Sequence, residues 1–346
     1  MTHLREIERT LKRKPFRPHP LFRSGHAQTL AGYAWPRRVL LHGHERDEAR
    51  TFEVEPGVRL LAHCRWQAAR QKHPTLIVVH GLEGSSASRY MLGTADKAYR
   101  AGFNALRLNL RSCGDTFHLT PTLYHSGMAH DFLAIVQELI TRDGLTDIFL
   151  GGFSLSGNMS LKLAGDEGAR LPRELRGVFA VSPAIDLPAC AAAIAWRSNW
   201  LYQHDFLRRL RRRLRAADKF YPGRYDLSDL RAVRTLRDFD ARYTAPAGGY
   251  RDVDDYYTSA SSLPRIPDIR RPALIIHAED DPFVPFASFR NPALKENPYV
   301  VLLAPRHGGH VGFVAADREP AADRFWAENR LVEFCRLVLA GAQAES

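Results

Sequence analysis

The chain alternates short runs of apolar, often β-branched residues with longer stretches of helical periodicity. The run from Thr75 to His80 is apolar between its ends and lies between Pro74 and Gly81, which is typical of a strand covered on both faces. The same pattern predicts strands at 103–109, 147–151, 177–181, 273–277 and 299–303, and helices at 88–101, at 127–141, just after Phe153 and at 323–340. Strands that alternate with helices favour parallel pairing and a sheet with helices on both faces.

Two regions interrupt this alternation. Before Thr75, the stretches 39–41 and 58–64 are predicted as antiparallel edge strands that begin the sheet. Between Pro183 and about Pro264 the sequence becomes helical and rich in Arg and Tyr, and it is too long to be a plain loop. We therefore predict one α/β domain with an N-terminal arm at residues 1–38. Its core comprises residues 39–182 and 265–346, and a helical cap is inserted at residues 183–264.

Composition narrows the location and the class of the protein. With 346 residues, 45% of them hydrophobic, the chain can bury the core of such a domain. No apolar run reaches the roughly 18 residues that span a bilayer, and residues 1–17 lack the apolar stretch of a secretory signal. The four cysteines are scattered and form no pair with metal-binding spacing: Cys64, Cys113, Cys190 and Cys335. These features favour a cytoplasmic protein.

Part of the formal net charge of +11 is concentrated in one predicted helix, from Phe206 to Arg215. Its apolar side chains share one face and its arginines are expected on the other: Phe206, Leu207, Leu210 and Leu214 against the Arg residues between them. We favour a solvated surface helix and keep weak contact with an anionic membrane as an alternative. No nucleic-acid partner is expected, because no aromatic and basic platform accompanies the arginines.

The segment from Leu150 to Asn158 carries the most chemical information. A predicted strand ends and a predicted helix begins within it, and Ser154 stands at the turn between them. This is the arrangement of a nucleophile elbow, in which small neighbours allow a strained turn to present the serine hydroxyl above the sheet. Gly152 fills the first small position, whereas Ser156 occupies the second, where glycine is usual. Ser156 is the weaker nucleophile candidate because it lies inside the predicted helix. A glycine-rich turn without chemistry is the alternative.

A serine nucleophile needs a base and a third group that orients the base, and this type of sheet supplies them in the order Ser, Asp or Glu, His. In the acidic loop after the next-to-last predicted strand, we expect Asp281, directly before Pro-Phe-Val-Pro, to be the orienting group rather than Glu279 or Asp280. After the last predicted strand, His310 follows two glycines and is the expected base, with His307 as a surface or loop-bracing residue. A metal site at the two histidines is the weaker alternative, because no carboxylate or cysteine completes it nearby.

Ester cleavage also needs donors for the oxyanion, usually two backbone N–H groups. Leu155, the residue after the nucleophile, is expected to supply one of them. The loop 80–86 follows the first predicted parallel strand and contains two glycines that let its backbone turn inward. Leu82 in this loop is therefore the predicted second donor.

Together these motifs resemble the YheT-like group of α/β-hydrolases, bacterial relatives of the mammalian α/β-hydrolase-domain proteins that act on acyl esters. The similarity extends from about residue 16 to the C-terminus and includes Gly25-His-Ala-Gln-Thr29, where the family has His-Leu-Gln-Thr. The other matching segments are 80–86, 124–127, 152–158, 237–240, 255–257, 275–283 and 307–313.

The resemblance implies the α/β-hydrolase fold, a triad of Ser154, Asp281 and His310, no cofactor or metal, and carboxylesterase-type activity. Two residues depart from the family pattern, Ser156 and Ser112, each where glycine is common. Ser156 affects the geometry expected of the elbow but leaves the nucleophile in place.

We therefore expect a serine hydrolase that cleaves a small carboxylic ester, with a short or medium acyl chain, through an acyl-enzyme. Five aromatic residues of the cap are candidates for the apolar wall of the acyl site, with packing of the cap on the core as the alternative for each of them: Trp196, Trp200, Tyr202, Phe220 and Tyr221. Alternative functions are a lipid-ester hydrolase or acyltransferase at a membrane surface, and a non-catalytic binding protein on the same fold. The oligomeric state is open.

Overall fold

The computed structural model describes residues 2–37, 47–317 and 323–344. Its strands are β1 Glu48–Glu55, β2 Val58–Arg65, β3 Thr75–Val79, β4 Asn104–Leu108, β5 Ile148–Phe153, β6 Leu175–Val181, β7 Ala273–Ile276 and β8 Val300–Leu303. Among the described residues they form one sheet in the order β1-β2-β4-β3-β5-β6-β7-β8. Strands β3 to β8 run parallel to their neighbours within that set, and β1 and β2 are antiparallel. The six strands predicted from Thr75 onward are confirmed.

The antiparallel edge was predicted only in part. The expected strand at 58–64 is confirmed as β2. Its neighbour β1 was missed, because Phe52 is the only buried residue in an otherwise polar stretch that gives little apolar pattern. The predicted strand at 39–41 lies outside the described residues.

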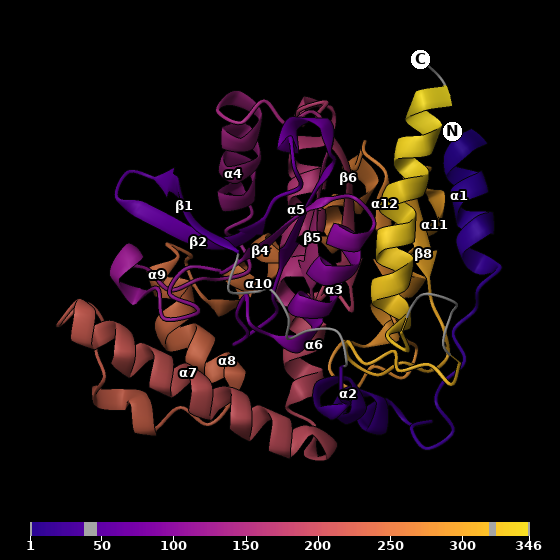
Figure 1. The fold of residues 1–346 in the computed structure, drawn as a ribbon. Helices are drawn as coiled ribbons and strands as arrows, with labels where there is room; N and C mark the ends of the chain where they lie inside the picture. The colour runs from indigo at the N-terminus through magenta and orange to yellow at the C-terminus, as the bar shows by residue number, and fades with distance from the viewer. Residues whose placement is uncertain (1, 38–46, 318–322, 345–346) are drawn as a thin grey trace.

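Helices cover both faces of the sheet (Figure 1). On one face lie α3 (Arg89–Arg100) and α12 (Trp326–Ala344), with α1 (Thr2–Lys12) against α12. On the other lie α4 (His130–Thr141) and α5 (Leu155–Glu167), with the short α11 (Pro292–Glu296) beside β8. Side chains alternate along a strand, so Leu76 and Val78 of β3 join the first layer and Ile77 and Val79 the second.

A helical cap is inserted between β6 and β7. Its helices are α6 Leu187–Ile194, α7 Trp200–Phe220, α8 Leu236–Phe239, α9 Ala245–Ala247 and α10 Val253–Ala260. The long α7 lies across the lower edge of the sheet in Figure 1, where the parallel strands end. Leu207, Leu210 and Leu214 of α7 are buried in the small core of the cap, so the predicted apolar face is confirmed and is covered by protein.

The segment predicted as an N-terminal arm contains two helices that pack on the core. Ile7 and Leu11 of α1 are buried beside α12. The second helix, α2 (Gly25–Ala34), lies below the sheet near the start of α7 (Figure 1). None of the helices in the described ranges is both long enough and apolar enough to cross a membrane.

Candidate active site

Ser154 alone forms the turn between β5, which ends at Phe153, and α5, which begins at Leu155. Its backbone has φ 55° and ψ −115°, a conformation that residues other than glycine rarely adopt. The N–H of Ser154 donates to the carbonyl of Val181 at the end of β6 (2.9 Å). A strained serine between a strand and a helix is the geometry of a nucleophile elbow.

Ser156 takes a structural place that glycine usually holds. Its side chain is fully buried, and its hydroxyl donates to the carbonyl of Val79 in β3 (2.7 Å) and accepts from the N–H of Phe153 (3.0 Å). A Cβ on Gly152 would lie 2.1 Å from this hydroxyl oxygen, so the two small residues fit only together. Ser156 therefore braces the elbow against the neighbouring strand and is not exposed for attack on a substrate.

His310 and Asp281 are hydrogen-bonded, with 2.8 Å between Nδ1 and Oδ2. Asp281 follows β7 and His310 follows β8, so two loops at the same edge of the sheet bring them together. A carboxylate only accepts hydrogen bonds, so Nδ1 carries the proton and Nε2 of the neutral ring keeps a lone pair. The ring of Phe283 packs on His310, with 4.7 Å between centroids. A general base requires this arrangement, with Nδ1 bonded to the carboxylate and Nε2 free to accept a proton.

The Asp281 carboxyl is completely buried, yet it is held as a carboxylate. Burial by itself raises its pKa, but the hydrogen bond from His310, the charge that this ring carries when it is protonated, and the N–H of Phe283 (2.8 Å) together outweigh burial and lower the pKa. The N–H of Val284 also donates to it (3.1 Å). The nearby His277 ring stays neutral, because burial lowers its pKa to about 4. Asp281 is thus a buried negative charge directed at His310.

The neighbouring acids and the second histidine have other contacts. Asp280 accepts from the N–H of Gly309 (2.9 Å) and lies 3.3 Å from Nδ1 of His307. The His307 side chain is 44% exposed, and Glu279 is exposed as well. These contacts match the loop-bracing and solvent-facing roles expected of the three residues. Within the described ranges, no three His, Cys, Asp or Glu side chains are grouped as for a metal ion.

Ser182, directly after β6, connects the nucleophile to the histidine loop. The carbonyl of Val181 accepts from the N–H of Ser154 (2.9 Å), and the hydroxyl of Ser182 accepts from the N–H of Val311 (3.0 Å). Ser154 and Val311, the residue after His310, are thus hydrogen-bonded to the consecutive residues Val181 and Ser182. In the described part of the chain, no hydrogen bond joins the Ser154 hydroxyl to His310. Such bonds are often long in free enzymes and shorten when substrate binds.

The predicted oxyanion loop lies against the elbow. A Cβ on Gly81 would be 3.2 Å from the Cβ of Ser154, a tight contact, so a glycine eases the close approach of the loop backbone to the elbow. Leu82, the next residue, and Leu155 line the same cavity, which has a volume of about 70 Å³. Leu155 is the first residue of α5, and its N–H has no acceptor within the helix. The two predicted donors therefore share one cavity beside Ser154.

The cap reaches this loop through a buried ion pair. Nε of Arg213 in α7 lies 2.6 Å from Oε1 of Glu83, and the two side chains are 10% and 4% exposed. Tyr124 adds a hydrogen bond, since its hydroxyl accepts from the N–H of Glu83 (2.8 Å). The prediction that the arginines of this helix face outward is wrong for Arg213, because Glu83 compensates its charge inside the protein.

The shared cavity lies between the core and the cap. Its lining residues are Leu82, Leu123, Tyr124, His125, Leu155, Leu210, Arg213, Leu236, Phe239, Asp240, Tyr243, Thr244, Ala247 and Tyr256. The five cap aromatics predicted as candidates for the acyl wall do not line this cavity. Trp196, Trp200 and Phe220 are more than half exposed, and Tyr202 packs on Phe283 instead (4.6 Å between centroids).

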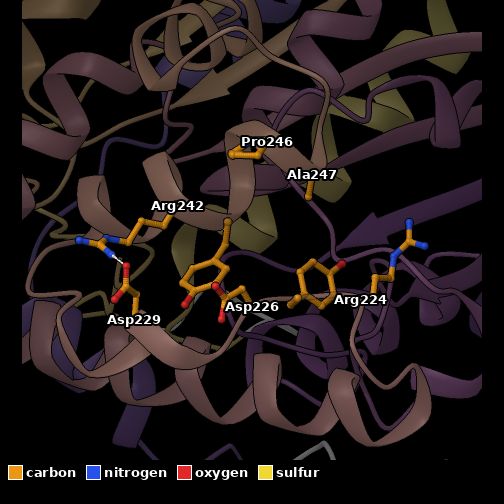
Figure 2. Close-up of a pocket in the computed structure, with 8 residues that line it drawn as sticks. Arg224, Asp226, Asp229, Arg242, Pro246 and Ala247 are labelled. Atoms are coloured by element: carbon orange, nitrogen blue, oxygen red, sulfur yellow. Dashed lines mark hydrogen bonds and ion pairs between the residues drawn. The ribbon is translucent and has the colours of Figure 1, made fainter.

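A larger cavity, of about 500 Å³, lies within the cap (Figure 2). It is lined by charged and apolar residues, and Arg242 forms an ion pair with Asp229 across it (2.5 Å). None of the predicted site residues lines this cavity. The smaller cavity is lined by Leu82 and Leu155 of the predicted site residues, but not by Ser154, Asp281 or His310.

The motif Gly25-His-Ala-Gln-Thr29 was given no role from the sequence, and Ser182 was not predicted to have one. In the structure Thr29 and Ser182 both accept hydrogen bonds from the backbone of the histidine loop. The N-terminal motif was the available signal for Thr29. No local pattern distinguishes Ser182 from other serines that follow a strand.

A mostly parallel sheet with Ser154, Asp281 and His310 on loops at its strand ends is typical of the α/β-hydrolases. The model of the alpha/beta hydrolase fold family matches residues 74–316, and the chain belongs to that family. Within it, the chain is 33% identical to "Putative esterase YheT" of Escherichia coli (strain K12), over 79% of this chain and 80% of that protein. The recognition of a YheT-like α/β-hydrolase from the sequence motifs is confirmed.

Other relatives are named as lipases and phospholipases. The chain is 33% identical to a "Monoacylglycerol lipase" of Saccharomyces cerevisiae, over 74% of this chain and 57% of that protein. Among solved structures it is similar to the esterase Pf2001 of Pyrococcus furiosus, with a TM-score of 0.57, 16% identity and coverage of 94% and 98% of the two chains. Est1E from Butyrivibrio proteoclasticus has a TM-score of 0.53 at 19% identity, with coverage of 84% and 99%. These structures share the fold.

Proposed function

We propose that the protein is a carboxylesterase-type serine hydrolase with Ser154 as nucleophile, His310 as base and Asp281 as the group that orients the base. The observation that carries this proposal is the buried Asp281–His310 hydrogen bond at the strand edge where Ser154 forms a strained turn. The esterase and lipase names of the relatives support the same class of reaction.

The proposed reaction has two halves. His310 Nε2 takes the proton of the Ser154 hydroxyl as its oxygen attacks the ester carbonyl carbon, and the N–H groups of Leu82 and Leu155 hold the oxyanion. The intermediate then expels the alcohol, which receives the proton from His310. In the second half, His310 takes a proton from water, which attacks the acyl-enzyme. The carboxylic acid leaves, and the proton returns to Ser154. No cofactor is needed for either half.

We infer a short acyl chain for the substrate. Drug-sized ligands occupy pockets of roughly 300–1,000 Å³, whereas the cavity that holds Leu82 and Leu155 measures about 70 Å³. Leu210 of α7 and Phe239 of α8 form part of its apolar wall, so the cap limits the length of the acyl group. A series of p-nitrophenyl esters from acetate to palmitate tests this. We expect kcat/KM to be greatest between acetate and butyrate; a maximum at palmitate would contradict the proposal.

Hydrolysis of lipid esters at an anionic membrane surface is the second candidate. The apolar face of α7 is covered by the cap, so it is not the contact surface. Large apolar side chains are exposed instead on α2 and at the start of α7: Leu30 (57%), Tyr33 (72%), Trp200 (61%) and Leu201 (69%). His26 and Tyr202 stack between the two helices, with 5.7 Å between centroids. Exposed apolar groups beside exposed arginines such as Arg208 are the composition of a surface that binds anionic lipid.

A further inference from the structure

Helix α2 contacts the loop that carries His310. The hydroxyl of Thr29 accepts from the N–H of His310 (2.9 Å) and donates to the carbonyl of Gly25 one turn earlier (2.7 Å). The Gln28 side chain, which is fully buried, accepts from the N–H of Val314 (2.8 Å) and donates to its carbonyl (3.1 Å). Two consecutive residues of α2 thus hold the loop at His310 and again four residues later.

The two backbones also touch directly. A Cβ on Gly309 would lie 2.2 Å from the carbonyl oxygen of Gly25, and a Cβ on Gly25 would lie 1.8 Å from that of Asp280. A Cβ on Gly32 would lie 2.6 Å from the Cα of Gly312. Real Cβ atoms essentially never lie this close to another atom. A larger residue at Gly309 or Gly32 would therefore separate α2 from the His310 loop, and one at Gly25 would separate α2 from the loop of Asp280.

The loop needs such outside support. Gly309, Val311 and Phe313 all have positive φ, at 57°, 60° and 45°. Valine and phenylalanine pay a steric cost in this region, and such backbone persists only where the surroundings fix it. The bonds from Thr29 and Gln28, with the bond from Val311 to Ser182, are surroundings of this kind.

We infer that α2 is a positioning element for the catalytic base: Thr29 and Gln28 fix the loop backbone and thereby set the reach of the His310 ring toward Ser154. This inference rests on the proposed function. It assigns the motif Gly25-His-Ala-Gln-Thr29 a role in turnover although Thr29 and Gln28 bond only to backbone groups. A displacement of about 1 Å in a reacting group can cost a hundredfold in rate.

The test compares purified variants of the full chain with p-nitrophenyl butyrate as substrate. Thr29→Val keeps the shape of the side chain but removes the acceptor for His310. We expect kcat to fall about tenfold to a hundredfold with KM within about twofold, because ground-state binding is unchanged. Thr29→Ser, which restores the hydroxyl, should recover most of the loss. Thr141→Val is the matched control, since Thr141 makes the same bond within its helix, to the carbonyl of Gln137 (2.9 Å), and is exposed.

The result that would overturn the inference is a folded Thr29→Val with wild-type kcat, or a loss that Thr29→Ser does not recover. If Thr29→Val does not fold, Thr29→Ala, which adds no bulk, takes its place with the same expectation. Ser154→Ala measured in parallel separates this inference from the proposed function. If that variant keeps wild-type turnover, the proposed function fails; if it is inactive while Thr29→Val is fully active, only the role of α2 fails.

Discussion

Ser154 and the loop that carries His310 both bond to the end of β6, but the rest of their support comes from different parts of the molecule. Ser154 is fixed by its own strand and helix and by adjacent strands, through Val181 and the hydroxyl of Ser156. His310 stands on a loop held by Thr29, which is 281 positions earlier in the chain. The placement of Ser154 therefore depends on local features of the core, whereas that of His310 also depends on a helix outside the strand and helix alternation.

The largest effect should come from the nucleophile itself. Ser154→Ala removes only a hydroxyl, so the protein should stay folded. Turnover of p-nitrophenyl butyrate should fall at least about a thousandfold, and the oxyanion hole should account for the residual activity. Ser156→Ala, which removes a structural hydroxyl next to the elbow, is the matched comparison. The kcat of Ser156→Ala should fall less than about tenfold, and the variant should lose about 1 kcal/mol in the free energy of unfolding. A more severe loss in Ser156→Ala than in Ser154→Ala would reassign the nucleophile.

The second prediction separates the adjacent acids. Asp281→Asn should lower kcat at least about a hundredfold, because the amide favours the wrong tautomer of His310 and does not balance the charge of its imidazolium. Asp280→Asn should cost much less, since Asp280 bonds to Gly309 and His307 rather than to the base. Steady-state kinetics of the two variants show which of the two aspartates orients His310. Greater damage from Asp280→Asn would move the triad by one residue.

The third prediction concerns the anchor of the oxyanion loop in the cap. Arg213→Met leaves the Glu83 carboxylate buried without its partner and should cost about 3–5 kcal/mol in the free energy of unfolding. The double variant Arg213→Met with Glu83→Gln should recover part of this loss, because the unpaired charge is gone. Urea unfolding of the wild type and these two variants measures both effects. A double variant no more stable than Arg213→Met would show that the charge is not the cause.

Two aspartates, the buried Asp281 and the half-buried Asp240, should respond to pH in opposite ways. The pKa of Asp281 is lowered by His310, so the stability that Asp281 contributes is present at neutral pH and is lost as pH falls below about 4. Burial raises the pKa of Asp240 to about 6, since only the hydroxyls of Thr244 and Tyr257 donate to it. Its stabilising contribution is full below about pH 4 and is lost as pH rises through 6.

Asp240→Asn tests this difference. The variant lacks the carboxyl that must ionise, so its stability relative to the wild type should rise by about 2–3 kcal/mol between pH 4 and pH 7. Urea unfolding across this range gives the value. A constant difference between the two proteins at all pH values would contradict the raised pKa.

The smallest effect is expected at the exposed surface of α2 and α7. Binding to vesicles that contain anionic lipid should weaken as salt rises, because charges are screened within about 8 Å at physiological ionic strength. Trp200→Ser should weaken binding further without changing kcat for p-nitrophenyl butyrate. Absence of vesicle binding at low salt would leave the second candidate function without support.

The contrast between the two parts of the site also explains what the sequence could predict. Strands β3 to β8 were predicted correctly because their apolar runs are continuous. Ser154 was proposed because the elbow signal lies within a few residues. Asp281 and His310 were selected from close neighbours by order along the chain and by Pro and Gly positions.

What could not be predicted depends on long-range contacts. The role of Thr29 becomes visible only when α2 is placed against the histidine loop. Arg213 was expected to face solvent, because nothing near it in the sequence reveals Glu83 as its partner. The acyl wall was assigned to aromatic residues such as Trp196, whereas leucines of α7 and α8 line the cavity.

The most direct test of the central claim, that Ser154 is a nucleophile activated by His310, is covalent labelling with a fluorophosphonate followed by mass spectrometry of the peptides. We expect one adduct per chain, on Ser154, no adduct in Ser154→Ala, and labelling slowed at least about a hundredfold in His310→Ala but not in His307→Ala. An adduct on another residue, or equal labelling of wild type and His310→Ala, would contradict the account.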